Sequence, residues 1–102
     1  MSNKREVGIR LLTLSWCDYC MWLKSELDAE GIAYDNIDAY DFPKFADEIE
    51  EKFKTDDYPI VFLDLGDKII TFVSETELET SDTLRTFDSI PELVGIIKKY
   101  LK

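Results

Sequence analysis

In the first third of the chain, the spacing of the apolar positions changes from a continuous run to a helical repeat. An apolar run over residues 7–14 predicts a buried strand. Over 17–30 apolar positions recur at i, i+3 and i+7, which predicts a helix, and Gly31 supplies its C-terminal stop. A second strand is expected over 32–38. The apolar positions of the helix are Cys20, Leu23 and Leu27.

A second helix and a hairpin are expected in the middle of the chain. The helix opens around Pro43, because proline is tolerated in a first helical turn. The β-branched and aromatic run 60–65, a turn at Gly66 and a returning run 68–73 predict the hairpin. The expected apolar stripe of the helix is Phe42, Phe45, Ile49 and Phe53.

The last quarter of the chain begins with a polar, acidic stretch. Residues 74–87 are expected to form an exposed connection that allows some strand. Ser89 and Glu92 then have the spacing of a capping box, which predicts the start of a final helix. The expected inward stripe of that helix is Leu93, Val94, Ile97 and Leu101.

The element order is therefore β-α-β-α-β-β-α, which predicts an α/β fold. The first β-α-β unit is expected to cross over right-handed and to give two parallel strands. With the hairpin, this predicts one mixed four-stranded sheet with helices on both faces, in a single domain over 1–102. Ligands of such sheets gather at the carboxyl ends of the parallel strands, which is where residues 16–20 fall.

Composition narrows the possible partners. The chain has 102 residues, is 45% hydrophobic and carries a formal charge of −10 at pH 7. This charge argues against nucleic acid and against anionic membrane surfaces, and favours a protein partner with a basic face, unless it serves solubility alone. The first ten residues are polar and lack the apolar region of a signal peptide, so we expect a cytoplasmic protein.

The two cysteines of the chain, Cys17 and Cys20, lie two residues apart at the start of the first predicted helix. A helix N-terminus carries unpaired N–H groups and a partial positive charge, which favour a thiolate. Thiolates attack disulfides, and a partner less than one turn away can close a small disulfide ring. This is the layout of a reversible dithiol/disulfide exchanger.

Three other interpretations of the cysteine pair remain open from the residues alone. A closed zinc site needs four ligands, and the chain has no histidine and no third cysteine, so it would have to use carboxylates. A permanent structural disulfide across so short a loop would remove little unfolded-state entropy. The pair could also be two buried, inert thiols.

Two motifs resemble those of the glutaredoxins, the compact branch of the thioredoxin-like fold. Residues 17–20, Cys-Asp-Tyr-Cys, resemble the family's Cys-Pro-Tyr-Cys, and residues 58–62, Tyr-Pro-Ile-Val-Phe, resemble its Thr-Val-Pro-X-Val-Phe. The element order extends the resemblance over nearly the whole chain. A Cys-X-X-Cys between a first strand and a first helix, followed about forty residues later by a proline that opens a hairpin, is a specific combination.

The resemblance implies the roles of the site residues. Cys17 would be the nucleophile and Cys20 the resolving cysteine. The Tyr58–Pro59 bond would be cis and lie against the Cys17 sulfur, with the Tyr58 backbone offered to an extended substrate; otherwise Pro59 would be an edge proline that starts a strand. Trp16 is expected either to contact substrate or to pack the helix against the sheet. The expected substrate-binding residues are Trp16, Asp18, Tyr19, Tyr58, Pro59, Phe87 and Asp88.

The chain departs from the family pattern at three places. Asp18 stands where the family has proline, and its carboxylate disfavours a neighbouring thiolate. The basic residue that often precedes the motif is missing. The Gly-Gly-X-Asp turn that receives a glutathione carboxylate is absent, and residues 86–89 are its nearest equivalent. Candidates for holding an anionic ligand, unless they are only solvated, are Lys52, Lys54 and Arg85.

The acidic stretch is expected to influence which substrates the protein binds. Its carboxylates fall near the position of the family's glutathione-binding turn, so they would repel glutathione and attract a basic protein substrate. Neutralising them is therefore predicted to lower the KM for glutathione. The four carboxylates concerned are Glu75, Glu77, Glu79 and Asp82.

These observations together predict a monomeric dithiol/disulfide oxidoreductase that holds no cofactor or metal. The resemblance implies disulfide-containing protein substrates, with ribonucleotide reductase as one family substrate. It also implies regeneration by glutathione or by a flavoprotein of the thioredoxin-reductase type. Two alternatives are an iron–sulfur cluster-binding dimer that uses Cys17 with external thiols, and a non-catalytic interaction domain.

Overall fold

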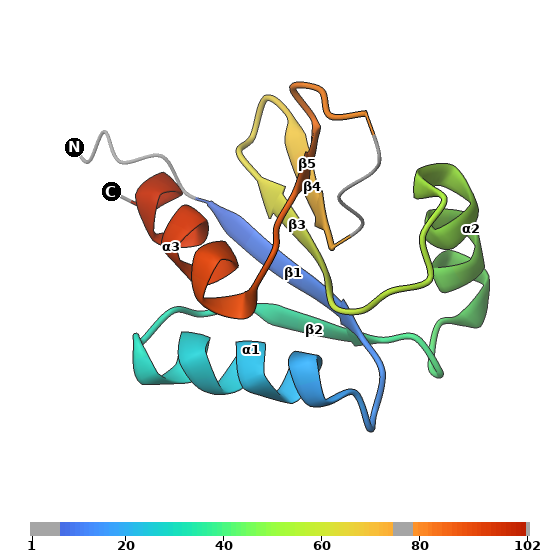
Figure 1. The fold of residues 1–102 in the computed structure, drawn as a ribbon, viewed down its shortest axis with the longest axis horizontal. Helices are drawn as coiled ribbons and strands as arrows, with labels where there is room; N and C mark the ends of the chain where they lie inside the picture. Colours follow the sequence, from blue (N-terminus) through green and yellow to red (C-terminus); the bar gives the residue numbers. More distant parts are fainter. Residues whose placement is uncertain (1–6, 75–78, 102) are drawn as a thin grey trace.

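The computed structural model describes residues 7–74 and 79–101 of the chain. These residues form a sheet flanked by three helices (Figure 1). In chain order the elements are β1 Gly8–Thr13, α1 Asp18–Ala29, β2 Asp35–Asp38, α2 Pro43–Phe53, β3 Ile60–Asp64, β4 Ile69–Val73, β5 Leu84–Thr86 and α3 Ile90–Tyr100. No helix among the described residues is long and apolar enough to cross a bilayer.

The sheet has the strand order β2-β1-β3-β4-β5. β1 and β2 pair in parallel, as predicted, and β3 and β4 form the predicted antiparallel hairpin. β3 also pairs antiparallel with β1, which joins the two units into one sheet. The prediction of four strands was wrong, because β5 in the acidic connection adds a fifth strand parallel to β4. Its three residues pair with Thr71, Phe72 and Val73.

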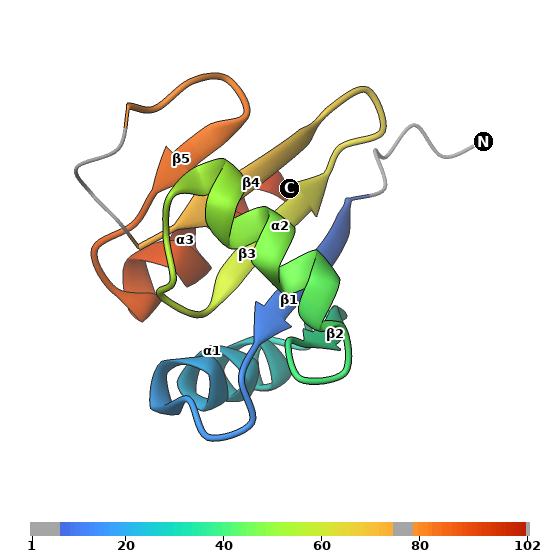
Figure 2. The same ribbon diagram turned by 90° about the vertical axis from the view of Figure 1, so that its right-hand side faces the viewer.

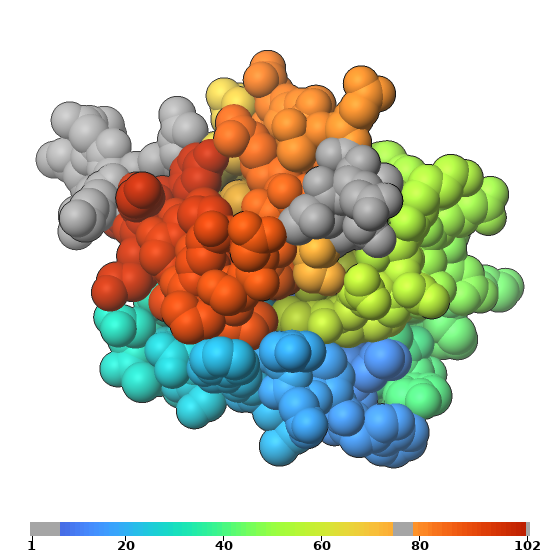
Figure 3. Space-filling model, in the orientation of Figure 1, coloured from blue at the N-terminus to red at the C-terminus, as the bar shows by residue number. Residues whose placement is uncertain are grey.

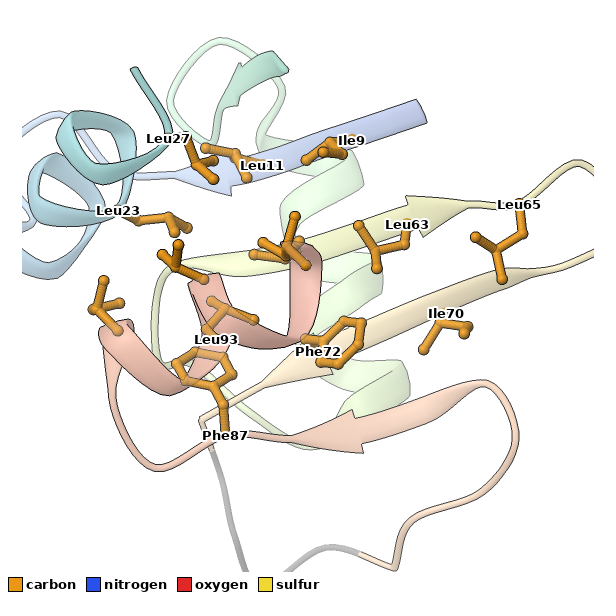
Figure 4. Close-up of a cluster of buried hydrophobic side chains, with 14 residues drawn as sticks. Ile9, Leu11, Leu23, Leu27, Leu63, Leu65, Ile70, Phe72, Phe87 and Leu93 are labelled. Carbon is orange, nitrogen blue, oxygen red and sulfur yellow. The ribbon is translucent and has the colours of Figure 1, made fainter. Parts of the chain in front are cut away.

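Helices cover both faces of the sheet, as predicted. α1 and α3 lie on one face and share a large apolar core with β1, β3 and β4, in which Leu23, Leu93 and Phe72 are among the buried side chains (Figure 4). α2 lies on the opposite face, in front of the sheet in Figure 2, over a smaller core that contains Leu12 and Phe62.

The predicted apolar stripe of α2 was wrong at its N-terminal end. Phe42 and Phe45 are exposed, whereas Ile49 and Phe53 are half-buried. Only Ala46 of this helix is fully buried. Phe45 nevertheless packs its ring against Phe62 of β3, with the centroids 6.1 Å apart, so the stripe fails at Phe42, which precedes the first residue of the helix.

The ends of α1 and α3 follow their predicted signals. α1 ends with Gly31 at φ +70°, a conformation in which glycine has no side-chain penalty. At the start of α3 the Ser89 hydroxyl accepts a hydrogen bond from the Glu92 N–H at 3.2 Å. The Glu92 carboxylate accepts from the N–H of Asp88, one residue before the cap. At the other end of α3 the prediction of an inward Leu101 was wrong, because this side chain is exposed.

Candidate active site

Cys17 lies at the N-cap of α1, directly after the loop that leaves β1. Its sulfur accepts a hydrogen bond from the backbone N–H of Cys20 at 3.1 Å. As a thiol it donates to the carbonyl oxygen of Tyr58, 3.6 Å away. The sulfur is half-buried and free, so it is held by the main chain on two sides and still accessible.

Cys20 lies one turn deeper in α1 and is completely buried. Burial is the main cause that raises its pKa from 9.0 to about 12, and the hydrogen bond with Cys17 adds to the shift. Cys20 is therefore a thiol at neutral pH. The two cysteines differ in exposure, which does not fit the alternative of two buried, inert thiols.

The segment before β3 supplies the second wall of the site. The Tyr58–Pro59 bond is cis, as the resemblance implied, and Pro59 is buried. The Tyr58 hydroxyl donates a hydrogen bond to the carboxylate of Glu50 on α2. Burial, followed by this contact with Glu50, raises the pKa of Tyr58 above its usual range. The side chain is thus fixed to α2 while its carbonyl faces Cys17.

A pocket of about 450 Å³ opens beside these residues, and we call it the active-site pocket. It lies where the start of α1, the segment before β3 and the start of α3 meet, which are blue, yellow-green and orange-red on the face shown in Figure 3. Five predicted site residues line it: Tyr19, Tyr58, Pro59, Phe87 and Asp88. Phe87 also belongs to the apolar core and is only 4% exposed, so it fixes the floor of the pocket.

Four predicted site residues do not line the active-site pocket. Two are the cysteines themselves, which adjoin the pocket through Tyr58, whose carbonyl contacts the Cys17 sulfur; the other two are Trp16 and Asp18. Trp16 is 74% exposed and packs its ring against Tyr40, with centroids 5.2 Å apart. Of its two expected roles, packing α1 against the sheet is therefore wrong. Asp18 is exposed in the first turn of α1. Both residues flank Cys17 in the chain but lie outside the pocket.

Five lining residues were not predicted: Trp22, Asp57, Ser74, Ser89 and Ile90. For Trp22 a signal existed, because it lies three residues after Tyr19, and residues at that spacing share a helix face. The two rings stack at 6.3 Å with 22° between their planes. Asp57 directly precedes Tyr58, so it could have been found by extending the second motif by one residue.

The basic residues considered for an anionic ligand lie elsewhere. None of Lys52, Lys54 and Arg85 lines the active-site pocket. Lys52 and Lys54 are on α2 and at its C-cap, and Arg85 is on β5. Of the four carboxylates expected to repel glutathione, Glu79 and Asp82 are exposed. The other two, at positions 75 and 77, lie outside the described residues.

Comparison with known proteins identifies the family of the chain. The glutaredoxin family model matches residues 9–69, which contain both cysteines and Pro59. Two curated Mycobacterium tuberculosis proteins, from strains CDC 1551 and H37Rv, carry glutaredoxin as a provisional name and are each 50% identical over 31 residues. The match covers 30% of this chain and spans only 37% of the length of either relative. Because the family model covers more than half of the chain, the chain belongs to the glutaredoxin family.

Proposed function

We propose that the chain is a dithiol/disulfide oxidoreductase in which Cys17 attacks and Cys20 resolves. The observation that carries this proposal is the difference between the two sulfurs. Cys17 is half-buried at a helix N-cap and accepts an N–H bond at 3.1 Å, whereas Cys20 is a buried thiol with a raised pKa. Only the first sulfur combines access with a donor that stabilises negative charge.

In the first step the Cys17 thiolate attacks one sulfur of a substrate disulfide. The substrate S–S bond breaks, a mixed disulfide forms on Cys17, and the first substrate thiolate leaves and takes up a proton. The N–H of Cys20 stabilises the attacking charge at Cys17. The carbonyl of Tyr58 faces the same sulfur and accepts a hydrogen bond from the resting thiol.

In the second step Cys20 loses its proton and attacks the Cys17 sulfur. The mixed disulfide breaks, the second substrate thiol leaves, and a Cys17–Cys20 disulfide forms. Two electrons have then passed from the protein dithiol to the substrate. Burial is the main cause that raises the pKa of Cys20, so Cys20 reaches this step as a thiol, and the departing substrate thiolate takes up its proton.

An external thiol must return the two electrons. We propose glutathione or a flavoprotein of the thioredoxin-reductase type as the source, and disulfide-containing proteins, ribonucleotide reductase among them, as substrates. The family supports these partners in general terms. On this proposal the chain acts as a monomeric single domain in a reducing cytoplasm.

The test is reduction of 2-hydroxyethyl disulfide, an uncharged substrate, coupled to NADPH oxidation. One assay supplies glutathione with its reductase, and a second supplies a thioredoxin reductase. Wild type is compared with Cys17→Ser and Cys20→Ser. We expect turnover with at least one reductant, and its complete loss in Cys17→Ser.

The Cys20→Ser variant separates the steps. With only Cys17 present, the chain is expected to stop at a mixed disulfide, detected as an added substrate mass on Cys17. Activity that survives Cys17→Ser, or a mixed disulfide found on Cys20, would contradict the assigned roles. No turnover with either reductant would overturn the proposed function.

A further inference from the structure

We infer that the active-site pocket selects disulfides flanked by a cationic side chain, arginine above all. This inference rests on the proposed function and names the substrate class of the same site. It is carried by the charges and the aromatic surfaces that line the pocket next to Cys17. Tyr58 links the pocket to the nucleophile, because it lines the pocket and its carbonyl contacts the Cys17 sulfur.

The charged side chains that line the pocket are both acidic. Asp57 comes from the segment before β3 and Asp88 from the segment before α3, so the two carboxylates belong to different walls. Both residues are exposed. Neither carboxylate takes part in an ion pair or a side-chain hydrogen bond within residues 7–74 and 79–101. Because both side chains are exposed and line the pocket, a ligand in it can contact them.

Aromatic side chains supply the second half of the cation site. Tyr19 and Trp22 stack on each other along α1 and remain 61% and 43% exposed. Tyr58 and Phe87 line the same pocket. Aromatic faces attract cations, and a planar guanidinium can stack on a ring while it donates to a carboxylate. This combination favours arginine over lysine.

The same lining disfavours an anionic ligand. At neutral pH glutathione carries two carboxylates and one ammonium, and the residues that line the pocket include no cationic side chain to pair with its carboxylates. The net charge of −10 adds a field that attracts cations to the whole molecule. A basic segment next to a protein disulfide matches both the pocket and the field.

The test compares two disulfide-linked peptides that differ only in the residue beside the cysteine, arginine in one and glutamate in the other. Pre-reduced full-length protein is mixed with each peptide, and the rate of disulfide reduction is measured in low salt. We expect the arginine peptide to react about tenfold faster than the glutamate peptide. In Asp57→Asn/Asp88→Asn this ratio is expected to fall towards one.

The matched control is Glu48→Gln/Glu51→Gln, which removes two exposed carboxylates from α2 on the other face of the sheet. It changes the net charge equally and is expected to keep most of the rate ratio. An equal loss of the ratio in both double variants would overturn the assignment to the pocket. A ratio near one in wild type, with 2-hydroxyethyl disulfide still reduced, would overturn this inference alone. Loss of both reactions would instead contradict the proposed function.

Discussion

Both hydrogen bonds that hold the Cys17 sulfur involve main-chain atoms. One partner is the N–H of Cys20 and the other is the carbonyl of Tyr58. Main-chain partners survive substitution of the side chains around them. The position of the sulfur therefore does not depend on which side chains surround it. Asp18 can replace the family's proline while Cys17 stays at the N-cap.

The unequal exposure of the two cysteines predicts unequal alkylation. Cys17 is half-buried, whereas Cys20 is completely buried with a pKa near 12. With iodoacetamide at neutral pH we expect Cys17 to react about a hundredfold faster or more, because the thiolate is the reactive species. Peptide mass spectrometry of the reduced protein measures both rates. Preferential labelling of Cys20 would contradict the assignment.

The raised pKa of Cys20 also predicts how stability depends on pH. Above pH 9 the unfolded chain loses the Cys20 proton, whereas the fold retains it to about pH 12, so the unfolded state binds fewer protons. The free energy of unfolding should therefore fall in this window, by about 1.4 kcal/mol per pH unit from this group. Below pH 9 the contribution is fully present.

Urea unfolding of the reduced protein at several pH values measures this slope. Cys20→Ala removes the ionisable group and should flatten the curve, even though it lowers stability at every pH. Tyr58→Phe serves as a comparison, because the raised pKa of Tyr58 affects only pH values above about 10. Identical slopes for wild type and Cys20→Ala would exclude the buried thiol as the source.

At the scale of single elements, one hydroxyl group stabilises the N-terminus of α3. Ser89 accepts from the N–H of Glu92 at 3.2 Å, and Ser89→Ala leaves this N–H without its partner. We expect a loss of about 1 kcal/mol and a fall in Tm of about 4–8 °C, measured by thermal unfolding. Ser25→Ala, at an exposed position of α1, is the control and should change Tm little. Equal Tm values for both variants would contradict the cap.

α2 is attached differently from the other two helices. Ala46 is its only fully buried residue, whereas α1 and α3 each bury several large side chains in the main core. Helices with few buried contacts open locally at low cost. Native-state hydrogen exchange is therefore expected to be about tenfold faster or more for the α2 amides than for those of α1 and α3. Equal protection of all three helices would show that α2 is held more firmly than its burial indicates.

The sequence predicted those elements whose own residues carry the pattern. The hairpin, the Ser89 cap and the stop at Gly31 each depend on local chemistry, and each is present. The polar stretch 74–87 allowed some strand, but β5 could not be located in this way, because its three residues become a strand by pairing with β4. The burial of Phe42 failed for a related reason, since periodicity gives a face of a helix but not what lies opposite it.

The candidate site shows the same division. The motif residues Cys17, Cys20 and Pro59 were found from spacing and resemblance. The lining residues Trp22 and Asp57 were not, because the pocket forms between α1, the segment before β3 and the start of α3. Such a surface depends on how distant segments meet. Patterns within single elements point to separate lining residues, as the spacing from Tyr19 does for Trp22, but not to the pocket that these residues form together.

At the scale of the whole molecule, charge repulsion outweighs ion pairing. The net charge is −10, and the described part of the chain forms two ion pairs, Arg10–Asp64 and Glu30–Lys98, whose side chains are all partly exposed. Salt screens repulsion and attraction alike, but here repulsion dominates. Raising NaCl from about 20 mM to about 500 mM should increase Tm by a few degrees, measured by circular dichroism.

The variant Glu48→Gln/Glu51→Gln tests the cause of this salt effect. It makes the net charge less negative by two units and leaves both ion pairs intact, so its Tm should rise less with salt than that of wild type. A Tm that falls with salt in wild type would mean that attractive pairs dominate after all.

The strand order has a consequence for how the molecule meets copies of itself. The apolar strands β1, β3 and β4 are paired on both sides, and the two outer strands are β2, Asp-Asn-Ile-Asp, and β5, only three residues long with Arg85 at its centre. Short or charged outer strands resist edge-to-edge aggregation. β5 covers Thr71, Phe72 and Val73, so its loss would open the whole of β4, Ile-Ile-Thr-Phe-Val, as a template for cross-β growth. The three-residue strand β5 thus keeps the apolar strand β4 from pairing with other chains.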